Sequence, residues 1–502
     1  MPTTSGETTS IWTATAEVPK YQPLNENLTV DVCVIGAGIA GMTTAYTLAK
    51  AGQRVCVIDD GDIGSGETGR TTAHITAALD DRYYNIESMH GGEGARIAAE
   101  SHMAAINRAE EISRLENIDC DFTRLDGYLF LADHHPDKVL EDELEATHRA
   151  GISDTELVER APTAFFDTDL CLRFPRQGQF HPLKFLAGLA RCIERDGGKI
   201  YTGSHVDEVK DGAPPTVKVG EHTVTARAVV VATNASISDY VVTHAKQEPY
   251  RTFVIGARIP KGSVPTILLW DTPDPYHYIR IQQLDDHDVL IVGGEDHKTG
   301  HKDDGGERFQ AIEEWTRERF PMIESIAYRW SGQVLEPVDY MSFTGVTPGG
   351  QNVFMHSGDS GNGITHGIMA GIMLPELILK GSHPWAELYK PSRISLRSAG
   401  TLIKHNVDAM IQYADYVMPA ESIEGIERGE GRVIMRHGKR IAAYRDDEGI
   451  LHERSAVCTH LKCIVEWNST EKSWDCPCHG SRFDPHGKVL NGPAVAPLAE
   501  PE

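Results

Sequence analysis

The sequence predicts an α/β domain with an interleaved antiparallel sheet, followed by a small all-β domain at the C-terminal end. Between residues 29 and 60 the apolar residues change from a β-branched run to helical spacing and back, which indicates the α/β domain. Alternating apolar residues in 250–295 indicate the antiparallel sheet, and short strands and turns from residue 421 indicate the all-β domain. With 502 residues, the chain is long enough for two or three domains.

The overall composition is that of a soluble globular protein, with 40% hydrophobic and 24% charged residues. The formal net charge of −25 argues against a nucleic-acid partner, which favours a basic surface. No aliphatic run approaches the roughly 20 residues that span a bilayer, and the first residues lack the basic and apolar segments of a secretory signal. We therefore expect a cytoplasmic protein with no membrane span and no nucleic-acid partner.

The first elements of the chain predict an arm followed by a βαβ unit. Residues 1–28 are polar and contain proline, so we expect an extended N-terminal arm. The run from Val30 to Ile35 predicts a buried strand, and the apolar spacing from Ile39 to Ala49 predicts a helix that ends near Gly52. A second buried strand follows from Arg54 to Ile58, which completes the unit.

The turn between the first strand and the helix has the pattern GxGxxG, from Gly36 to Gly41. In such a turn the first glycine allows the sharp bend, the second lets backbone approach a pyrophosphate, and the third lets helix pack on strand. The helix N-terminus then faces the phosphates. Asp59 ends the second strand, where an acid accepts hydrogen bonds from an adenosine ribose. The sequence therefore predicts a dinucleotide-binding domain of the Rossmann type.

Three further features favour FAD over NAD as the dinucleotide. The segment 64–76 is rich in hydroxyl groups and contains Arg70, which suits contacts to phosphate and isoalloxazine. The apolar strand 228–232 returns to the nucleotide, after a helix predicted at 182–195. The glycine-rich turn within 356–371 leads into a helix, whose N-terminus stabilises negative charge on a reduced flavin.

These motifs resemble the glycine/D-amino-acid oxidase family of FAD enzymes over about residues 29–395. The resemblance implies an FAD-dependent oxidoreductase domain that oxidises a C–N bond of an amine or amino acid. It places FAD-binding parts at about 29–80, 180–245 and 330–380, and substrate parts at about 81–180 and 246–330. It assigns FAD contacts to Gly36, Gly38, Gly41, Asp59, Arg70, Thr71, Thr72, Val206, Gly358, Asn362, Gly363 and Ile364.

The resemblance leaves the substrate contacts and the flavin linkage less defined. We expect FAD to be bound without a covalent link, with His74 as a pocket residue, although some family members attach flavin through a histidine or cysteine. The candidate substrate or catalytic residues are Arg251, Tyr276, Tyr278, His297 and Gln333. Arg251 can hold a carboxylate bidentately. For each of the five the alternative is a surface or core role.

Four of the nine cysteines lie within 21 residues, in CTHLKC and, after twelve residues, CPCHGSRF. Each half offers one cysteine and one histidine. Thiolates suit the iron of an iron–sulfur cluster, and two imidazoles on one iron remove negative charge and raise its reduction potential. The alternative is a zinc site with four thiolates, which would leave His460 and His479 without a role. We expect the five scattered cysteines to be small buried hydrophobes.

This segment closely resembles the Rieske [2Fe–2S] family over about 421–500, including a leading hairpin (GKRIAAYRDDEG) and a proline loop (GKVLNGPAVAPL). The resemblance implies Cys458, His460, Cys476 and His479 as ligands and a disulfide between Cys463 and Cys478. Ser481 stands where the family places a hydroxyl bonded to a cluster sulfur, and Phe483 where high-potential members carry tyrosine. We therefore expect a potential below respiratory Rieske centres and above plant-type ferredoxins.

The two resemblances combine into one functional hypothesis. We expect a linker helix at 396–420 and a Rieske domain at 421–502, with electrons passing from flavin to cluster and on to a small redox protein, a quinone or O₂. One dinucleotide fingerprint is visible, which disfavours NAD(P)H as electron source. Two alternatives stay open: an NAD(P)H-dependent flavin/Rieske reductase, and an electron-transfer or redox-sensing module without substrate chemistry.

Overall fold

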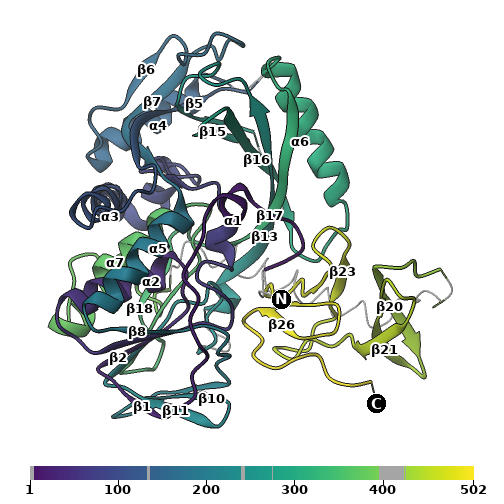
Figure 1. Cartoon of the computed structure of the whole chain (residues 1–502). Helices are drawn as coiled ribbons and strands as arrows, with labels where there is room; N and C mark the ends of the chain where they lie inside the picture. The colour runs from purple at the N-terminus through teal and green to yellow at the C-terminus, as the bar shows by residue number, and fades with distance from the viewer. Residues whose placement is uncertain are drawn as a thin grey trace.

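The computed structural model describes residues 5–132, 136–238, 243–273, 275–394, 423 and 425–501. These residues form a large body and a smaller C-terminal part that lies against one side of it (Figure 1). The predicted linker helix at 396–420 lies outside the described residues. Among the residues described, no helix is both long enough and apolar enough to cross a membrane.

The core of the large body is a six-stranded sheet. It consists of β2 (Val32–Ile35), β3 (Val55–Ile58), β8 (Lys199–Tyr201), β12 (Ala228–Val231), β18 (Phe343–Val346) and β19 (Val353–Ser357). The order in space is β18-β19-β12-β2-β3-β8, parallel throughout except for β18 at one edge. Every residue of β2, β3 and β12 is buried, as expected for a parallel sheet covered on both faces.

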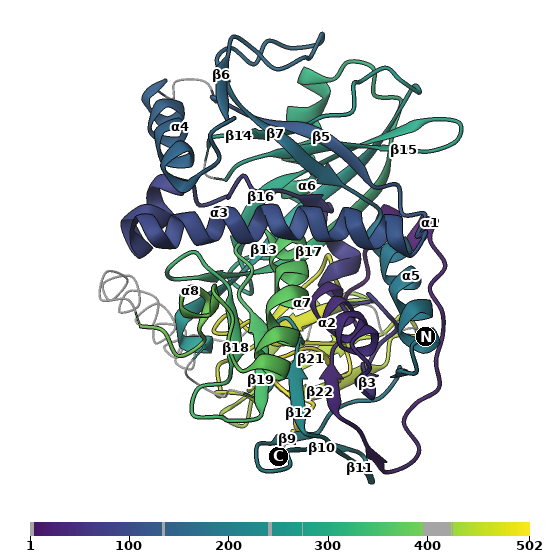
Figure 2. The ribbon, with the colours of Figure 1, turned by 90° about the vertical axis from the view of Figure 1, so that its left-hand side faces the viewer.

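Helices cover one face of this sheet and a small sheet covers the other. Figure 2 shows the helices α2 (Ile39–Lys50), α5 (Pro182–Arg195) and α7 (Gly363–Lys380) together. Val34 and Val57 pack with the helices, whereas their chain neighbours Cys33 and Cys56 pack with the small sheet, because successive side chains of a strand alternate between faces. The small sheet consists of β1 (Leu28–Thr29), β9 (Glu208–Lys210), β10 (Thr216–Val219) and β11 (His222–Thr225).

The elements predicted for this body agree closely with the structure, but the sequence pattern did not predict every element, and helices α3 (Tyr83–Leu115) and α4 (Lys138–Ala150) are among those it missed. The helix predicted at 182–195 is α5 itself. The longest helix, α3 (Tyr83–Leu115), was not apparent from the sequence pattern, because a glycine-rich stretch interrupts its apolar spacing. Gly91 there has a φ of 73°, and two helical segments join at that residue.

The predicted antiparallel sheet forms a second layer that spans both substrate segments. Its strands are β4 (His74–Ile75), β5 (Thr123–Phe130), β6 (Glu156–Val158), β7 (Cys171–Gln179), β13 (Gln247–Ile259), β14 (Leu268–Asp271), β15 (Tyr278–Gln283), β16 (Asp288–Lys298) and β17 (Ser325–Pro337). The path is β17-β13-β16-β15-β14-β5-β7-β4, with β6 on β7 and one parallel pair, β14 with β5. Helices α4 (Lys138–Ala150) and α6 (Gly305–Arg319) flank it (Figure 1).

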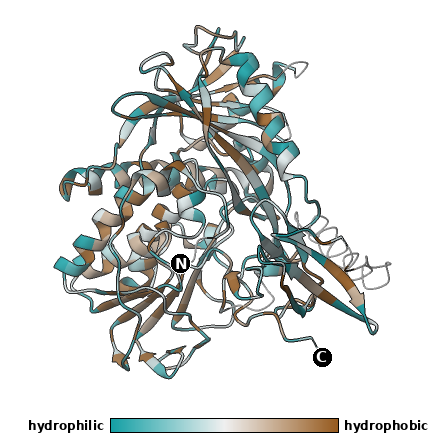
Figure 3. Cartoon of the chain, turned by 45° about the vertical axis from the view of Figure 1, so that its right-hand side comes forward, coloured by the Kyte–Doolittle hydropathy of each residue, from teal (hydrophilic) through white to brown (hydrophobic). Residues whose placement is uncertain are grey.

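The C-terminal part is all-β, as the sequence predicts. One sheet contains β20 (Glu430–Arg436), β21 (Lys439–Arg445) and β22 (Leu451–Ser455), and the other contains β23 (Glu466–Asn468), β24 (Ser473–Asp475), β25 (Arg482–Phe483) and β26 (Val489–Asn491). Its core joins Trp467, Trp474 and Phe483 to the four clustered cysteines. Figure 3 shows apolar residues on its strands, as on those of the parallel sheet.

The N-terminal arm is not wholly extended, because it contains a short buried helix, α1 (Ile11–Thr15). Trp12 of this helix is 0% exposed and its indole donates to the carbonyl of Thr71 at 2.6 Å. Further back, Thr8 donates to both Glu471 carboxylate oxygens, through its backbone N–H at 3.1 Å and its hydroxyl at 2.5 Å. The arm therefore ties the large body to the C-terminal part.

Buried charges form the junction between the two parts. Arg70 and Arg251 of the large body and Arg482 of the C-terminal part surround Glu471 and Asp475. Arg70 pairs with Glu471 at 2.9 Å, and Arg482 pairs with Asp475 at 3.0 Å. Burial raises the pKa of Glu471, but the three guanidinium groups outweigh burial and hold that pKa at about 2. Burial also raises the pKa of Asp475, but Arg482 and Arg251 outweigh burial and lower that pKa, so both carboxylates stay ionised at neutral pH.

Replacing Glu471 by Gln should weaken the junction strongly. The change leaves Arg70 and Arg251 buried with too few anions, which costs about 3 kcal/mol for a broken buried ion pair. Thermal or denaturant unfolding measures the loss. The matched control is Asp303→Asn, which alters an exposed contact between the parts, the hydrogen bonds from Ser469 to Asp303 at 2.8 and 2.9 Å. Equal stability of the Glu471→Gln and control proteins would contradict the assignment.

Candidate functional site

A cavity of about 340 Å³ lies where the six-stranded sheet, the nine-stranded sheet and the C-terminal part meet. Gly36 and Gly38 line it from the turn after β2, and Thr252 and Tyr278 line it from the nine-stranded sheet. The C-terminal part contributes the segment around Leu490, so all three parts enclose the same space.

The glycine turn has the backbone that close approach to a dinucleotide requires. Gly36 has a φ of 106°, and a Cβ there would lie 2.2 Å from the carbonyl oxygen of Ala232. A Cβ on Gly41 would lie 1.9 Å from the carbonyl oxygen of Gly36, so helix and turn touch through backbone alone. The Asp59 carboxylate accepts from the Ala37 N–H at 2.6 Å, which anchors the turn.

Ten of the twelve residues predicted to contact FAD line this cavity. The ten are Gly36, Gly38, Asp59, Arg70, Thr71, Thr72, Val206, Asn362, Gly363 and Ile364. Gly41 and Gly358 are not among the lining residues, because each packs against protein: Gly41 against the turn, and Gly358 against Gln247 and Pro337. Their contribution is to shape the wall.

One end of the cavity, formed by the nine-stranded sheet, combines aromatic rings with carboxylates. Tyr276 and Tyr278 have ring centroids 5.5 Å apart, and Trp270 lies beside them in the wall. The Tyr276 hydroxyl donates to Asp80 at 2.5 Å. Burial raises the pKa of Asp80 above its usual range, although the hydrogen bond from Tyr276 and nearby Arg82 oppose the rise. Sequence reasoning missed this acid, because nothing local marks Asp80 as facing a site.

Three of the five substrate candidates line the cavity, and two do not. Tyr276, Tyr278 and Gln333 are lining residues. Arg251 is 1% exposed and engaged at the charged junction, where it donates to Ser331 at 2.6 Å. His297 stacks on Phe253 with ring centroids 5.5 Å apart.

The positions of Arg251 and His297 outside the cavity lining have a simple cause. Arg251 pairs in register with His297 on one side and with Gln333 on the other, across β16, β13 and β17. Cross-strand neighbours share a face of a sheet, and this face packs on the C-terminal part. The strand register that sends Arg251 there cannot be read from its local sequence.

His74 lines the cavity with both ring nitrogens in hydrogen-bonding contact. Nδ1 is 3.0 Å from the Thr72 hydroxyl, and Nε2 is 3.2 Å from the Ile279 carbonyl. Burial, helped by Arg280, lowers the pKa of His74 to about 3. A neutral, doubly hydrogen-bonded imidazole fits a pocket residue.

The cysteine- and histidine-bearing loops come together in the C-terminal part. Cys458 and Cys476 are 0% and 2% exposed, and the rings of His460 and His479 lie 5.1 Å apart. The Nδ1 atom of His479 is buried and has no hydrogen-bond partner among the described residues. A buried imidazole nitrogen without a partner is what a metal ligand presents.

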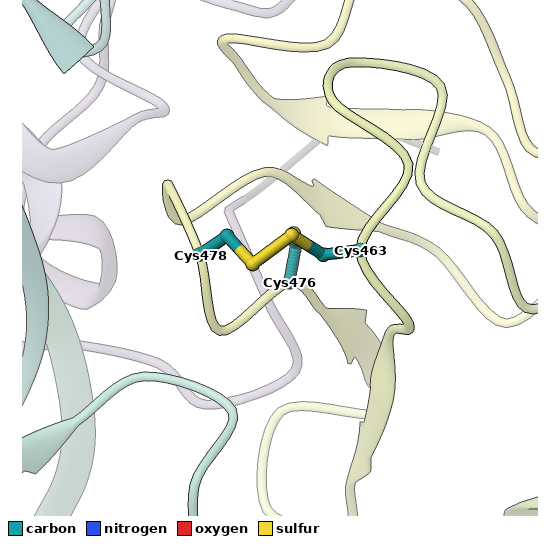
Figure 4. A group of neighbouring side chains, drawn as sticks. All are labelled: Cys463, Cys476 and Cys478. Atoms are coloured by element: carbon teal, nitrogen blue, oxygen red, sulfur yellow. A yellow bond between two sulfur atoms is a disulfide. The ribbon is translucent and has the colours of Figure 1, made fainter. Parts of the chain in front are cut away.

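The remaining two cysteines, Cys463 and Cys478, form a disulfide between the loops (Figure 4). Cys476 lies next to this bond, so three sulfur atoms gather within 4.8 Å of one another. Two of those sulfurs are joined to each other and cannot serve as thiolates. The disulfide therefore removes the four-thiolate zinc alternative and leaves Cys458 and Cys476 as free thiols.

Comparisons with known proteins agree with both halves of the molecule. The family model for FAD dependent oxidoreductase matches residues 31–377, and the Rieske [2Fe-2S] domain model matches 416–502. A Bacillus subtilis (strain 168) protein named as a Rieske 2Fe-2S iron-sulfur protein is 32% identical over 97% of this chain and 96% of its own length. Gamma-glutamylputrescine oxidoreductase of Escherichia coli (strain K12) is 29% identical over 74% of this chain and 89% of its own.

Solved structures share the fold of the large body. L-proline dehydrogenase from P. horikoshii superposes with a TM-score of 0.61 at 20% identity, covering 74% of this chain and 98% of its own. Glycine oxidase from Geobacillus kaustophilus has a TM-score of 0.61 at 18% identity, covering 73% and 100%.

These findings define the chain as a flavoenzyme with an attached iron–sulfur domain. It belongs to the FAD dependent oxidoreductase family and carries a C-terminal Rieske [2Fe–2S] domain. Its cofactors are accordingly FAD and a [2Fe–2S] cluster. The site residues suit both groups. A Cβ at Gly36 would fill the turn where the dinucleotide approaches the backbone, and His479 has a buried ring nitrogen that is available to bind iron.

Substituting Gly41 by Ala should abolish retention of FAD. The added methyl group would overlap the carbonyl oxygen of Gly36 and push helix from strand. The absorbance of flavin released from purified protein measures the loss. Gly306→Ala is the control, since a Cβ at Gly306 meets nothing within 4 Å. Full flavin content in Gly41→Ala would disprove the expectation.

Proposed function

We propose that this protein oxidises the C–N bond of an amine, and that the electrons pass from FAD to the Rieske cluster and then to an external acceptor. The observation that carries the substrate class is the aromatic and acidic end of the cavity, where Trp270, Tyr276 and Tyr278 stand with Asp80 and Asp296. Aromatic faces and carboxylates together attract an ammonium group.

The arginines near the cavity are committed elsewhere, which favours an amine over an amino acid. Recognition of a carboxylate usually uses a bidentate arginine. Among the described lining residues the one arginine is Arg70, and it pairs with Glu471. Arg82 donates to the carbonyls of Leu79 and Asp80 at 3.1 and 2.9 Å.

The names of relatives support a nitrogen-containing substrate. Gamma-glutamylputrescine oxidoreductase matches most of the large body in sequence. The named L-proline dehydrogenase and glycine oxidase match it in fold. An amine or amino acid is common to these names, and the acidic wall of this cavity supports the amine in our proposal.

Specific residues are proposed to hold the two cofactors. Bound FAD would take two electrons from the substrate, and the cluster would accept them one at a time. The ten lining residues named above would hold FAD without a covalent link, and the ligands would be Cys458, His460, Cys476 and His479. A hydrogen bond with Cys476 lowers the pKa of the Cys458 thiol, and a weaker one with Ser481 lowers it further, so a hydroxyl lies beside the sulfur that would bind iron.

The proposal extends to domain limits and location. We take 29–395 as the oxidoreductase domain and 421–502 as the Rieske domain, and we propose a cytoplasmic location. Cys33 and Cys56 are directly paired across β2 and β3 yet remain free thiols, which suits a reducing compartment. Cell fractionation tests the location.

An anaerobic screen of amines and amino acids tests the function. Flavin bleaching followed by a paramagnetic signal from the reduced cluster is expected with an amine. Bleaching by NADPH without amine would favour the reductase alternative instead. Absence of bleaching with every compound would favour an electron-transfer module, and bleaching by amino acids alone would contradict the amine class.

Asp80→Asn should raise the KM for the amine by about tenfold, which corresponds to ~1.4 kcal/mol of lost attraction for the ammonium group. The asparagine keeps the shape and can still accept from Tyr276. Steady-state kinetics of the holoenzyme measures the change. The control is Asp62→Asn, which removes the same charge at a residue that does not line the cavity and should leave KM unaltered. An equal response of both variants would exclude a local role for Asp80.

The KM for the amine should also fall as pH rises from 6 to 8. Burial raises the pKa of Asp81 to about 7, with Asp80 adding to the rise and hydrogen bonding from Ser360 and nearby Arg82 opposing it. Asp81 does not line the cavity, but it follows Asp80, which does, and the two charges repel each other. Asp81 is therefore largely protonated at pH 6 and ionised at pH 8, where its charge adds to the attraction for a cation held at Asp80. Asp81→Asn should flatten the pH profile. A profile that stays the same in this variant would refute the assignment.

A further inference from the structure

One face of the nine-stranded sheet connects the flavin cavity to the cluster loops. On β17, Gln333 is 5% exposed and lines the cavity. Its Nε2 donates to the carbonyl oxygen of Gly480 at 3.0 Å, in the loop directly after His479. Its backbone N–H donates to Glu67 at 2.6 Å, which fixes the strand at this point. Gln333 thus borders both cofactor sites.

The contact at Gly480 is too close for any other residue. Gly480 has a φ of 77°, in the region that favours glycine. A Cβ there would lie 2.0 Å from Nε2 of Gln333 and 2.8 Å from Cβ of Pro249. Backbone of the histidine loop therefore rests directly on β13 and β17 of the oxidoreductase domain.

A second residue of the oxidoreductase domain touches both cluster histidines. His244 lies in a short 3₁₀ helix (His244–Lys246) and is 2% exposed. Its ring centroid is 5.1 Å from that of His460 and 6.3 Å from that of His479, both edge-on. Its Nε2 donates to the carbonyl of Ser236 at 2.8 Å, which holds the ring in place.

We propose that Gln333 and His244 are positioning residues that hold the histidine side of the cluster loops against the flavin cavity, so that the Rieske domain is a fixed internal electron acceptor. The buried charges of Arg70, Glu471 and Asp475 favour this fixed arrangement over a swinging domain, because separation would expose or strand them. The inference rests on the proposed flow of electrons from flavin to cluster.

The electron balance sets what the contact must do. Oxidation of an amine to an imine removes a hydride and a proton, which is two electrons and two protons in all. The two electrons cross the contact singly, and an external one-electron acceptor removes each before the next arrives. The two protons leave to solvent. A fixed contact between the two domains allows both one-electron transfers of each turnover.

Variants at the contact test the proposal in the loaded protein. Gln333→Asn keeps the amide but is too short to reach Gly480, Gln333→Leu removes the donor, and His244→Leu removes the ring contact. Ser469→Ala is the matched control, since it removes another hydrogen bond between the parts, 2.8 Å long, made by two residues that do not line the cavity. Iron content, flavin content and the paramagnetic spectrum after dithionite are recorded for every variant.

The readout is the rate of cluster reduction divided by the rate of flavin reduction in the same variant, measured by rapid mixing. We expect this ratio to fall by about threefold or more at Gln333, where one buried hydrogen bond to the histidine loop is lost, and at His244, where the ring contact is lost. It should stay unchanged in Ser469→Ala. An unchanged ratio in both Gln333→Asn and His244→Leu would overturn the proposal. An equal fall of the ratio in the Ser469→Ala control would overturn it too, as would loss of the cluster from both the Gln333→Asn and the His244→Leu proteins.

A second way of reducing the flavin separates this proposal from the proposed function. Light-driven reduction of the bound flavin needs no substrate. If no amine reduces the flavin but light does, and the cluster then follows at a rate that depends on Gln333, the substrate assignment fails while the contact stands. If the cluster stays oxidised while the flavin is reduced by light, the contact fails whatever the substrate is.

Discussion

The buried charges between the two parts are the interaction on which the molecule depends. Three guanidinium groups from Arg70, Arg251 and Arg482 neutralise Glu471 and Asp475 away from water. Such a set costs desolvation energy and contributes little net stability over an apolar contact. The set favours the observed arrangement, since a shift of one part on the other would leave a charge buried without its counterpart.

That arrangement explains why one cavity has walls from distant segments. Arg70 follows the glycine turn in sequence, and its pairing with Glu471 brings the Rieske domain to the flavin wall. The segment around Leu490 then closes the cavity, and Thr8 of the N-terminal arm reinforces the same pairing. Flavin binding, cluster position and docking of the arm are thus consequences of one packing solution.

Sequence patterns with local causes were sufficient for much of this protein. The turn from Gly36 to Gly41 and the paired Cys and His loops are short motifs, and few other residue types could meet the same backbone or ligand requirements. Where a prediction depended on which way a side chain faces across strands, the sequence did not give the direction. Arg251 and His297 lie on the face that meets the Rieske domain, and Asp80 faces the cavity although no sequence pattern predicted it.

The sequence by itself determined the two cofactor classes, because the motifs for FAD and for the iron–sulfur cluster lie in contiguous residues whose backbone and ligand chemistry are local. The resemblance to the Rieske family added the disulfide partners, which the structure confirms. Only the tertiary structure decided that Arg251 serves the domain junction, that acids and aromatic rings share one end of the cavity, and that Gln333 touches the loop of His479. Those facts depend on strand register and on burial between segments hundreds of residues apart, and no local pattern encodes either.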